Sequence, residues 1–165
     1  MKIVSMDPEK CVGCRNCEYA CSFINAADFE RKDSRIRVSI FPNERVCFPL
    51  TCVHCSEPFC MEVCPSGAIT KDSVSGAVTI DGSRCVGCKM CILACPFGLI
   101  YFNEEEQISQ KCDLCQGEPN CVKFCISGAL QFVESEEAYQ SKREQFVTKL
   151  KSMLESKTTF EDEAK

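Results

Sequence analysis

The most constraining feature of this chain is a cysteine pattern that recurs along most of its length. The stretch CVGCKMCILACP, residues 85–96, separates four cysteines by two, two and three residues and follows the last with proline. A near copy, CVGCRNCEYAC, stands at residues 11–21. Two more quartets keep the final gap of three but widen the middle gap to four and five residues. The chain thus places all but one of its 17 cysteines in four related blocks, and Cys47 is the exception.

A chain this rich in cysteine is typical of a disulfide scaffold or a metalloprotein. Disulfides require an oxidising compartment, but the stretch MKIVSMDPEKC has no apolar signal core, no small-residue cleavage site and no twin-arginine pair. We therefore expect a cytoplasmic protein whose thiolates bind metal. No segment approaches the roughly 18 apolar residues of a membrane span, so we expect no direct membrane insertion. A net charge of −5 without a basic block argues against nucleic acid as a partner.

The spacing favours iron–sulfur clusters over zinc. The run C-x2-C-x2-C-x3-C-P is that of bacterial ferredoxins, in which the fourth cysteine binds the neighbouring cluster. Three cysteines at this spacing in a tight loop can each reach a different iron of one cubane, and Gly13 and Gly87 allow close approach of the backbone. Paired C-x2-C units also form structural zinc sites, but these are complete with four ligands. A zinc-stabilised interaction module is the distant alternative.

Two internal repeats indicate which blocks share a domain. VTIDGSRCVGCKMC (78–91) matches VSMDPEKCVGCRNC (4–17), and CSEPFCMEVCPSGAI (55–69) matches CQGEPNCVKFCISGAL (115–130). Between the second and third blocks the sequence predicts two strands joined by a Ser-Gly turn, the hairpin that links the halves of a bacterial-type ferredoxin. The fourth block has no block-one-like partner after it, but one is present at the N-terminus.

We therefore predict an α+β fold with two bacterial-ferredoxin-like domains, in which short β-hairpins and short helices surround 4Fe–4S clusters and one domain is inserted into the other. The predicted parts are a split outer domain (1–21 and 112–133), a hairpin insert (22–51), an inner domain (52–111), and a C-terminal helix and tail (134–165). The rival arrangement pairs the first block with the second and the third with the fourth, which makes the insert a very long hairpin.

This arrangement resembles the four-cluster ferredoxin-like electron-transfer subunits that accompany molybdenum or tungsten pterin oxidoreductases, some hydrogenases and carbon monoxide dehydrogenase. The resemblance covers about residues 1–133 and includes the stretches RIRVSIF, PLTCVHC and CPFGLIYF. It implies four 4Fe–4S clusters whose iron is bound by sixteen cysteines: Cys11, Cys14, Cys17 and Cys125 for cluster 1; Cys21, Cys112, Cys115 and Cys121 for cluster 2; Cys52, Cys55, Cys60 and Cys95 for cluster 3; Cys64, Cys85, Cys88 and Cys91 for cluster 4.

The resemblance also implies an electron-transfer subunit that relays single electrons between a larger catalytic subunit and a second carrier. We expect the catalytic partner to be a tungsten or molybdenum pterin enzyme such as an aldehyde oxidoreductase. A free-standing polyferredoxin and a carrier for hydrogenase or carbon monoxide dehydrogenase are the alternatives. The sequence has no nucleotide loop, flavin fingerprint or nucleophile–base pair, so we expect no catalytic residues and no substrate site of its own.

Some expectations concern segments outside the cysteine blocks. RIRVSIF (35–41) and RVCFPL (45–50) predict a hairpin in the insert, and residues 135–156 have the apolar spacing of a helix, followed by a frayed tail, KTTFEDEAK. The apolar stripe of this helix has two candidate roles, packing on its own domain and docking against a larger subunit.

Single residues near the blocks carry further expectations. Ser22 and Ile126 stand where the inner blocks have proline, so we expect the outer cluster pair to be less well shielded from solvent. Cys47 is predicted to be a buried, inert thiol. His54 is predicted to pack beside a cluster, with a hydrogen bond to cluster sulfur as the alternative. Lys111, one of five basic residues beside the cysteines, is predicted to be a solvated surface charge. Its positive charge can at the same time favour the reduced state of a nearby cluster.

Overall fold

The structure, a computed structural model, describes residues 1–162 and divides into two compact units, Met1–Phe132 and Val133–Lys165. All the cysteines lie in the first unit. The elements follow in the order β1 (Lys2–Met6), α1 (Asn16–Ala26), η1 (Arg31–Asp33), β2 (Arg37–Phe41), β3 (Val46–Leu50), α2 (Phe59–Glu62), β4 (Ile69–Lys71), β5 (Val78–Ile80), α3 (Met90–Ala94), β6 (Tyr101–Asn103), β7 (Ile108–Gln110), η2 (Leu114–Gly117), α4 (Asn120–Lys123), β8 (Leu130–Glu134) and α5 (Ser135–Asp162). This is a small α+β fold with short hairpins and a C-terminal helix, as predicted.

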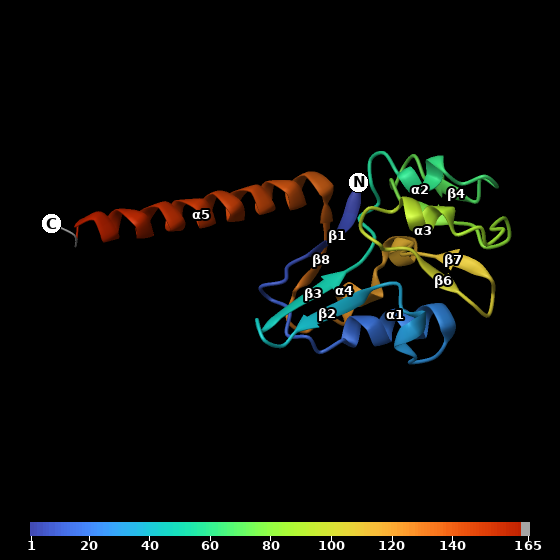
Figure 1. The fold of residues 1–165 in the computed structure, drawn as a ribbon. Helices are drawn as coiled ribbons and strands as arrows, with labels where there is room; N and C mark the ends of the chain where they lie inside the picture. The colour runs from blue at the N-terminus through green and yellow to red at the C-terminus, as the bar shows by residue number, and fades with distance from the viewer. Residues whose placement is uncertain (163–165) are drawn as a thin grey trace. The chain divides into compact units, whose positions relative to one another are not determined.

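The strands of the described chain form four separate two-stranded pairs, β1–β8, β2–β3, β4–β5 and β6–β7. The pairing of β1 with β8 places the N-terminal strand beside the strand that follows the fourth cysteine block (Figure 1). Just beyond β1, the backbone N–H of Asp7 donates to the carbonyl of Ala129 at 2.8 Å. The two ends of the first unit are therefore joined by backbone hydrogen bonds.

The two hairpins predicted from the sequence are confirmed. β4 and β5 pair antiparallel with Ile69 opposite Ile80, and their turn is closed by the Asp72 carboxylate, which accepts hydrogen bonds from Ser75 N and Oγ. β2 and β3 pair antiparallel in the insert. The β6–β7 hairpin was not predicted, because YFNEEEQISQ offers only three residues per strand and has no apolar alternation.

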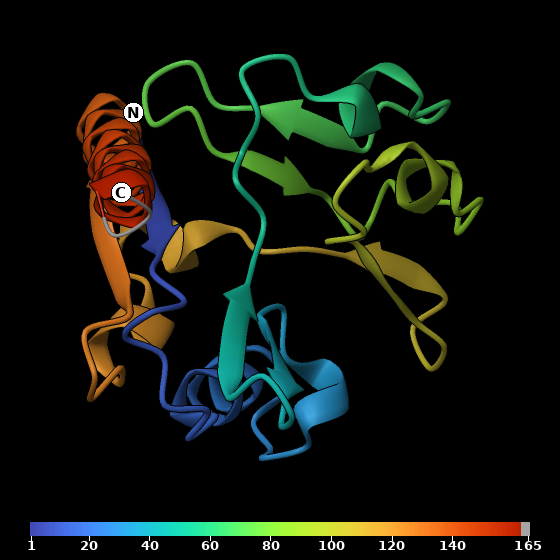
Figure 2. The same ribbon diagram turned by 60° about the vertical axis from the view of Figure 1, so that its left-hand side comes forward.

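The short helices of the cysteine blocks pack in pairs. α1 contacts α4, and α2 contacts α3. α1 and α3 each begin directly after a residue with left-handed backbone, Arg15 and Lys89, at the same place in the repeated motif. In Figure 2 the green segments of α2, α3 and β4–β5 lie together in one half of the first unit, whereas the blue and cyan segments of α1 and β2–β3 lie in the other.

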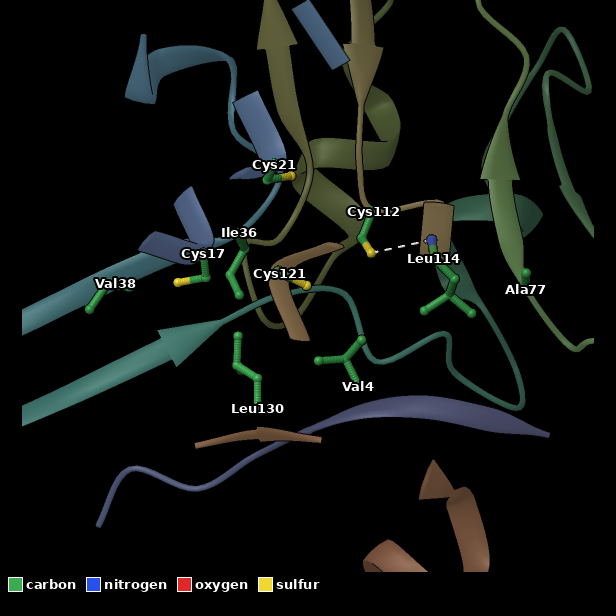
Figure 3. Packing of buried hydrophobic residues seen from close by; sticks show 10 residues of the cluster. All are labelled: Val4, Cys17, Cys21, Ile36, Val38, Ala77, Cys112, Leu114, Cys121 and Leu130. Carbon is green, nitrogen blue, oxygen red and sulfur yellow. Dashed lines mark hydrogen bonds between the residues drawn. The ribbon is translucent and has the colours of Figure 1, made fainter. Parts of the chain in front are cut away.

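Cysteines form a large part of the hydrophobic core of the first unit. One cluster of buried residues contains Cys17, Cys21, Cys112 and Cys121 among apolar side chains such as Ile36 (Figure 3). A second, smaller cluster contains Cys91 with three aliphatic side chains from β4, β5 and the segment before β6. Many of the large apolar residues, such as Phe29 and Leu93, are exposed, so the thiols and whatever they bind contribute much of the interior.

The second unit is dominated by α5, which confirms the predicted C-terminal helix. The helix extends to Asp162, so the expected frayed tail is wrong for residues 157–162, and residues 163–165 lie outside the described part of the chain. Among the side chains of this helix up to residue 153, the exposed apolar ones are Tyr139, Phe146, Val147, Leu150 and Met153. Within residues 1–162, no helix combines the length and the apolar character needed to cross a bilayer.

Candidate iron–sulfur centres

One cavity of the first unit is lined by four thiols of the second and third blocks, Cys52, Cys55, Cys60 and Cys95, together with Lys111. Burial raises the pKa of Cys55, and the charges of Cys52 and Cys95 add to this rise. Burial and the same two neighbours also raise the pKa of Cys60, while Lys111 opposes the rise. The four sulfurs thus act on one another across the cavity.

A second cavity is lined by Cys64, Cys85, Cys88 and Cys91. Burial raises the pKa of Cys91, and the charges of Cys85 and Cys88 contribute to the rise. In the described part of the chain, no three Cys, His, Asp or Glu side chains come together closely enough to hold a single metal ion. The thiols surround each cavity without meeting at one point, as sulfurs do that each bind a different iron of a larger cluster.

The first and fourth blocks bring another four thiols near one another. The pKa of Cys17 is raised to about 12. Burial is the largest cause, and the charges of Glu18, Cys125 and Cys11 also raise it. The pKa of Cys11 is also raised by burial, and Cys125 and Cys14 contribute to that rise. The Cys11 loop is therefore in electrostatic contact with Cys125, which lies more than a hundred residues along the chain.

The remaining thiols of these two blocks form the most buried group. Burial raises the pKa of Cys121, and the charges of Cys112, Cys21 and Cys115 add to the rise. Burial also raises the pKa of Cys112 to about 11. Figure 3 shows Cys21, Cys112 and Cys121 side by side within the core, with the backbone N–H of Leu114 donating to Cys112 Sγ at 3.4 Å.

The expected difference in shielding is wrong. The outer blocks contribute the buried thiols Cys17, Cys21, Cys112 and Cys121, whereas the inner blocks contribute only Cys91. The Ser22 side chain that replaces proline is fully buried, and its Oγ lies 2.7 Å from Asp28 Oδ1 and 2.6 Å from the Glu30 carbonyl oxygen, to one of which it donates its proton. The outer blocks therefore hold more buried thiols than the inner blocks.

Backbone N–H groups donate to several of the cysteine sulfurs. Such donors stabilise negative charge on sulfur and raise the reduction potential of a bound cluster. The donor–sulfur pairs are Arg35 N to Cys21 at 3.2 Å, His54 N to Cys52 at 3.4 Å, Leu114 N to Cys112 at 3.4 Å and Leu99 N to Cys95 at 3.5 Å. This chemistry fits thiolates that carry charge.

His54 has one ring nitrogen satisfied and the other free. The side chain is fully buried, and its Nδ1 accepts a hydrogen bond from the Val78 N–H at 3.0 Å. Burial, and after it the charge of Lys111, lowers the pKa of His54 to about 3. Nε2 therefore carries the proton, and it has no hydrogen-bond partner. An orphaned buried N–H beside Cys52 fits an acceptor that a cluster would supply.

The sequence-based prediction for Lys111 is wrong. Its side chain is only 3% exposed, and its ammonium donates to the backbone carbonyls of Val78 and Cys112. The sequence could not distinguish it from the other basic residues beside cysteines, because its burial depends on Val78 of β5, 33 residues away.

Cys47 is partly buried, not fully buried as predicted. It lies on β3 beside the loop of the first block, where a Cβ atom added at Gly13 would be 2.8 Å from its Sγ. Its charge also contributes to the raised pKa of Cys11, after burial. The thiol therefore packs against the backbone of a cluster-binding loop.

Comparison with known protein families places these four groups of thiols in context. Residues 43–135 match the family described as "4Fe-4S dicluster domain", and residues 3–26 match a "4Fe-4S binding domain". The first match spans more than half of the chain. The chain belongs to the 4Fe–4S dicluster family.

Curated relatives of this 4Fe–4S dicluster protein are subunits of oxidoreductases. The thiosulfate reductase electron transfer subunit PhsB of Salmonella typhi is 35% identical, over 80% of this chain and 75% of PhsB. The polyferredoxin-like subunit of the aliphatic sulfonate oxidoreductase of Pyrococcus furiosus is 38% identical, over 74% of this chain and 70% of that protein. Subunit beta of the NADH-dependent phenylglyoxylate dehydrogenase of Aromatoleum evansii is 36% identical over 82% of this chain, which spans only 31% of that subunit.

These relatives confirm the resemblance found in the sequence. They also confirm the prediction of an iron–sulfur electron-transfer subunit of an oxidoreductase, as opposed to a catalytic subunit. The 4Fe–4S type of the cofactor is likewise confirmed. The cluster number, the ligand of each iron, the domain boundaries and the catalytic partner remain predictions.

Proposed function

We propose that this chain binds four 4Fe–4S clusters through sixteen cysteines and relays single electrons between a larger catalytic subunit and a second carrier. Each cluster, when bound, supplies a one-electron redox couple. The polypeptide holds the ligands, donates hydrogen bonds to their sulfurs and excludes water from the buried ones. The observation that carries the proposal is the grouping of thiols from separate blocks around common sites.

The proposed inner clusters are supported by the two cavities. The set Cys52, Cys55, Cys60 and Cys95 lines one, and the set Cys64, Cys85, Cys88 and Cys91 lines the other. Each set takes three cysteines from one block and one from the other, as in two-cluster ferredoxins. A zinc site would instead bring four ligand atoms to about 2.0–2.3 Å from one ion.

The proposed outer clusters are supported by mutual electrostatic effects of the thiols. Cys17 is influenced by Cys125 and Cys11, and Cys11 by Cys125 and Cys14, in keeping with a cluster held by these four. Cys121 is influenced by Cys112, Cys21 and Cys115, in keeping with a second cluster held by these. The backbone N–H of Leu114, which donates to Cys112 Sγ, fits a charged acceptor at the second of these sites.

The insertion of one ferredoxin-like domain into the other is supported by the packing of the elements. The β1–β8 pair and the α1–α4 contact join the first block to the fourth. The β4–β5 hairpin and the α2–α3 contact join the second block to the third. We propose that residues 1–21 with 112–133 form the outer domain, 52–111 the inner domain and 22–51 the insert. The rival pairing would require α1 against α2 and α3 against α4.

We propose a tungsten or molybdenum pterin oxidoreductase as the catalytic partner and the cytoplasm as the location. The support is the sequence resemblance to subunits of such enzymes, together with relatives that are subunits of a thiosulfate reductase and an aliphatic sulfonate oxidoreductase. A free-standing polyferredoxin or a carrier for hydrogenase or carbon monoxide dehydrogenase is the alternative.

The test is anaerobic purification from the native cell under mild conditions. We expect about 16 iron atoms and an equal number of acid-labile sulfides per chain, a visible absorption that bleaches on reduction, and a co-purifying larger subunit. A colourless protein containing zinc would overturn the proposal. Full cluster content without any larger subunit would favour the free-standing polyferredoxin.

A further inference from the structure

A buried lysine lies at the junction of the two ferredoxin-like halves. Lys111 directly precedes Cys112 and is 3% exposed, although lysine is almost never buried without a compensating partner. Its ammonium donates to the carbonyl of Cys112 at 3.0 Å and to the carbonyl of Val78 in β5. Both acceptors are neutral backbone groups, and among the described residues no carboxylate forms an ion pair with Lys111.

The same side chain faces thiols of two different cluster sites. Lys111 lines the cavity of Cys52, Cys55, Cys60 and Cys95. Burial raises the pKa of Cys60, and the charge of Lys111 opposes that rise. For Cys112, burial raises the pKa and Lys111 again opposes it, after the Leu114 and Thr51 hydrogen bonds. One ammonium therefore borders the site of cluster 3 and hydrogen-bonds the backbone carbonyl of Cys112, a ligand of cluster 2.

The other polar groups at this junction do not cancel the charge of Lys111. Val78 donates its N–H to His54 Nδ1, so that ring nitrogen is an acceptor and the imidazole is neutral. The nearest acidic residue in the sequence, Asp113, accepts a hydrogen bond from Arg35 Nη1 at 2.6 Å. Asp113 is thus already paired with another cation.

We propose, on the basis of the four-cluster assignment above, that Lys111 is a potential-setting residue whose fixed charge raises the reduction potentials of clusters 2 and 3 together. Reduction adds one electron from an external donor and makes a site more negative. A cation in a buried, weakly screened position stabilises that added charge. Because both sites share the same ammonium, their potentials rise in parallel. The shared charge thus lowers the energy of an added electron on both sides of the junction between the two halves.

The test compares the full-length, cluster-loaded protein with three variants at this position. Lys111→Met removes the charge and the donor, Lys111→Gln removes the charge and keeps a donor, and Lys111→Arg keeps the charge.

Redox titration monitored by electron paramagnetic resonance follows all cluster potentials, with iron content measured on the same samples. For both neutral variants we expect two of the four couples to shift down by at least about 59 mV, equivalent to a tenfold lower reduced-to-oxidised ratio for a one-electron couple. For Lys111→Arg we expect the reduced-to-oxidised ratio of each cluster to stay within about threefold of the parent value.

Lys123→Met is the matched control. Lys123 lies two residues after Cys121, but it is exposed and pairs with Glu118 Oε2 at 2.6 Å. Solvent and this carboxylate screen its charge, so we expect less than about a twofold change in any reduced fraction. An equal shift in Lys123→Met and Lys111→Met would show that buried position is irrelevant and would overturn the proposal.

The remaining outcomes separate this inference from the proposed function. Fewer than four clusters in the parent protein would contradict the assignment itself. Four clusters in the parent with unshifted potentials in both neutral variants would leave the function intact and overturn the role of Lys111. A shift in Lys111→Met but not in Lys111→Gln would assign the effect to the hydrogen bond and also overturn it. If neither neutral variant takes up iron while Lys111→Arg does, the charge acts in assembly, and the proposal is equally wrong.

Discussion

Two of the glycines with left-handed backbone in the first unit have very different surroundings. Gly13 has a φ of +68°, and an added Cβ would lie 2.8 Å from Cys47 Sγ. Gly98 has a φ of +62°, yet nothing lies within 4 Å of its Cβ position. The pair therefore separates the cost of backbone strain from the cost of a clash with a neighbouring side chain.

We predict that Gly98→Ala destabilises the loaded protein by about 1–2 kcal/mol, the cost of left-handed backbone for an L-residue. Gly13→Ala should cost about 1–3 kcal/mol more, because the new methyl group must displace the Cys47 thiol. Guanidinium-induced loss of the cluster absorbance under anaerobic conditions measures both.

The double variant Gly13→Ala, Cys47→Ala controls this prediction. Removing Sγ leaves the nearest remaining Cys47 atom, Cβ, at 3.8 Å from the added methyl group. The stability of the double variant should therefore return close to that of Gly98→Ala. If the second substitution brings no recovery, the clash with Cys47 is not the cause.

At the scale of the elements, a single buried carboxylate joins α1 to the insert. Glu18 is 3% exposed and its Oε1 accepts a hydrogen bond from the Val38 N–H of β2 at 2.9 Å. Its Oε2 lies 3.6 Å from Arg31 Nε and 4.0 Å from Arg15 Nε. The first block is thus linked to β2 through one side chain.

We predict that Glu18→Ala destabilises the protein by about 1–3 kcal/mol, because the buried Val38 N–H loses its acceptor. Glu18→Gln keeps an oxygen at this position and should cost clearly less. The exposed Glu57→Ala serves as the control and should stay within about 0.5 kcal/mol of the parent. Equal losses for Glu18→Ala and Glu18→Gln would show that the ion pairs, not the backbone acceptor, matter here.

The helix α5 is the second testable element. All proposed ligands lie in the first unit, so a chain ending at Tyr139 should retain the full iron content and the cluster spectrum of the parent. The truncation keeps the buried Ala138 and removes the exposed apolar side chains from Phe146 to Met153. Iron analysis and thermal loss of the visible absorbance measure the outcome. A truncated chain with less iron would show that α5 supports the cluster-binding unit.

At the scale of the whole molecule, the fold and its cofactors depend on each other. Four of the ten buried residues in the larger core cluster are cysteines, and the smaller core also contains one. Short strands in separate pairs provide little cooperative hydrogen bonding. The free energy of metal binding therefore makes up a large share of the free energy of folding.

We predict that complete removal of iron, by chelation or oxidative cluster loss, unfolds the first unit. The far-ultraviolet circular dichroism should lose its strand signal. Because α5 belongs to the second unit, we expect its helical signal to persist. The chain ending at Tyr139 isolates the response of the first unit. An iron-free form of that chain with unchanged circular dichroism would contradict the prediction.

The sequence by itself determined the repeated cysteine blocks, the iron–sulfur chemistry, the β2–β3 and β4–β5 hairpins and the C-terminal helix, because all of these depend on spacings within a few dozen residues. Only the tertiary structure decided the burial of Lys111 and the outer thiols, the orphaned nitrogen of His54 and the contact of Cys47 with Gly13. Each of these depends on which distant segments meet. Desolvation and electrostatics at such contacts arise from three-dimensional packing, and residue spacing along the chain does not encode them directly.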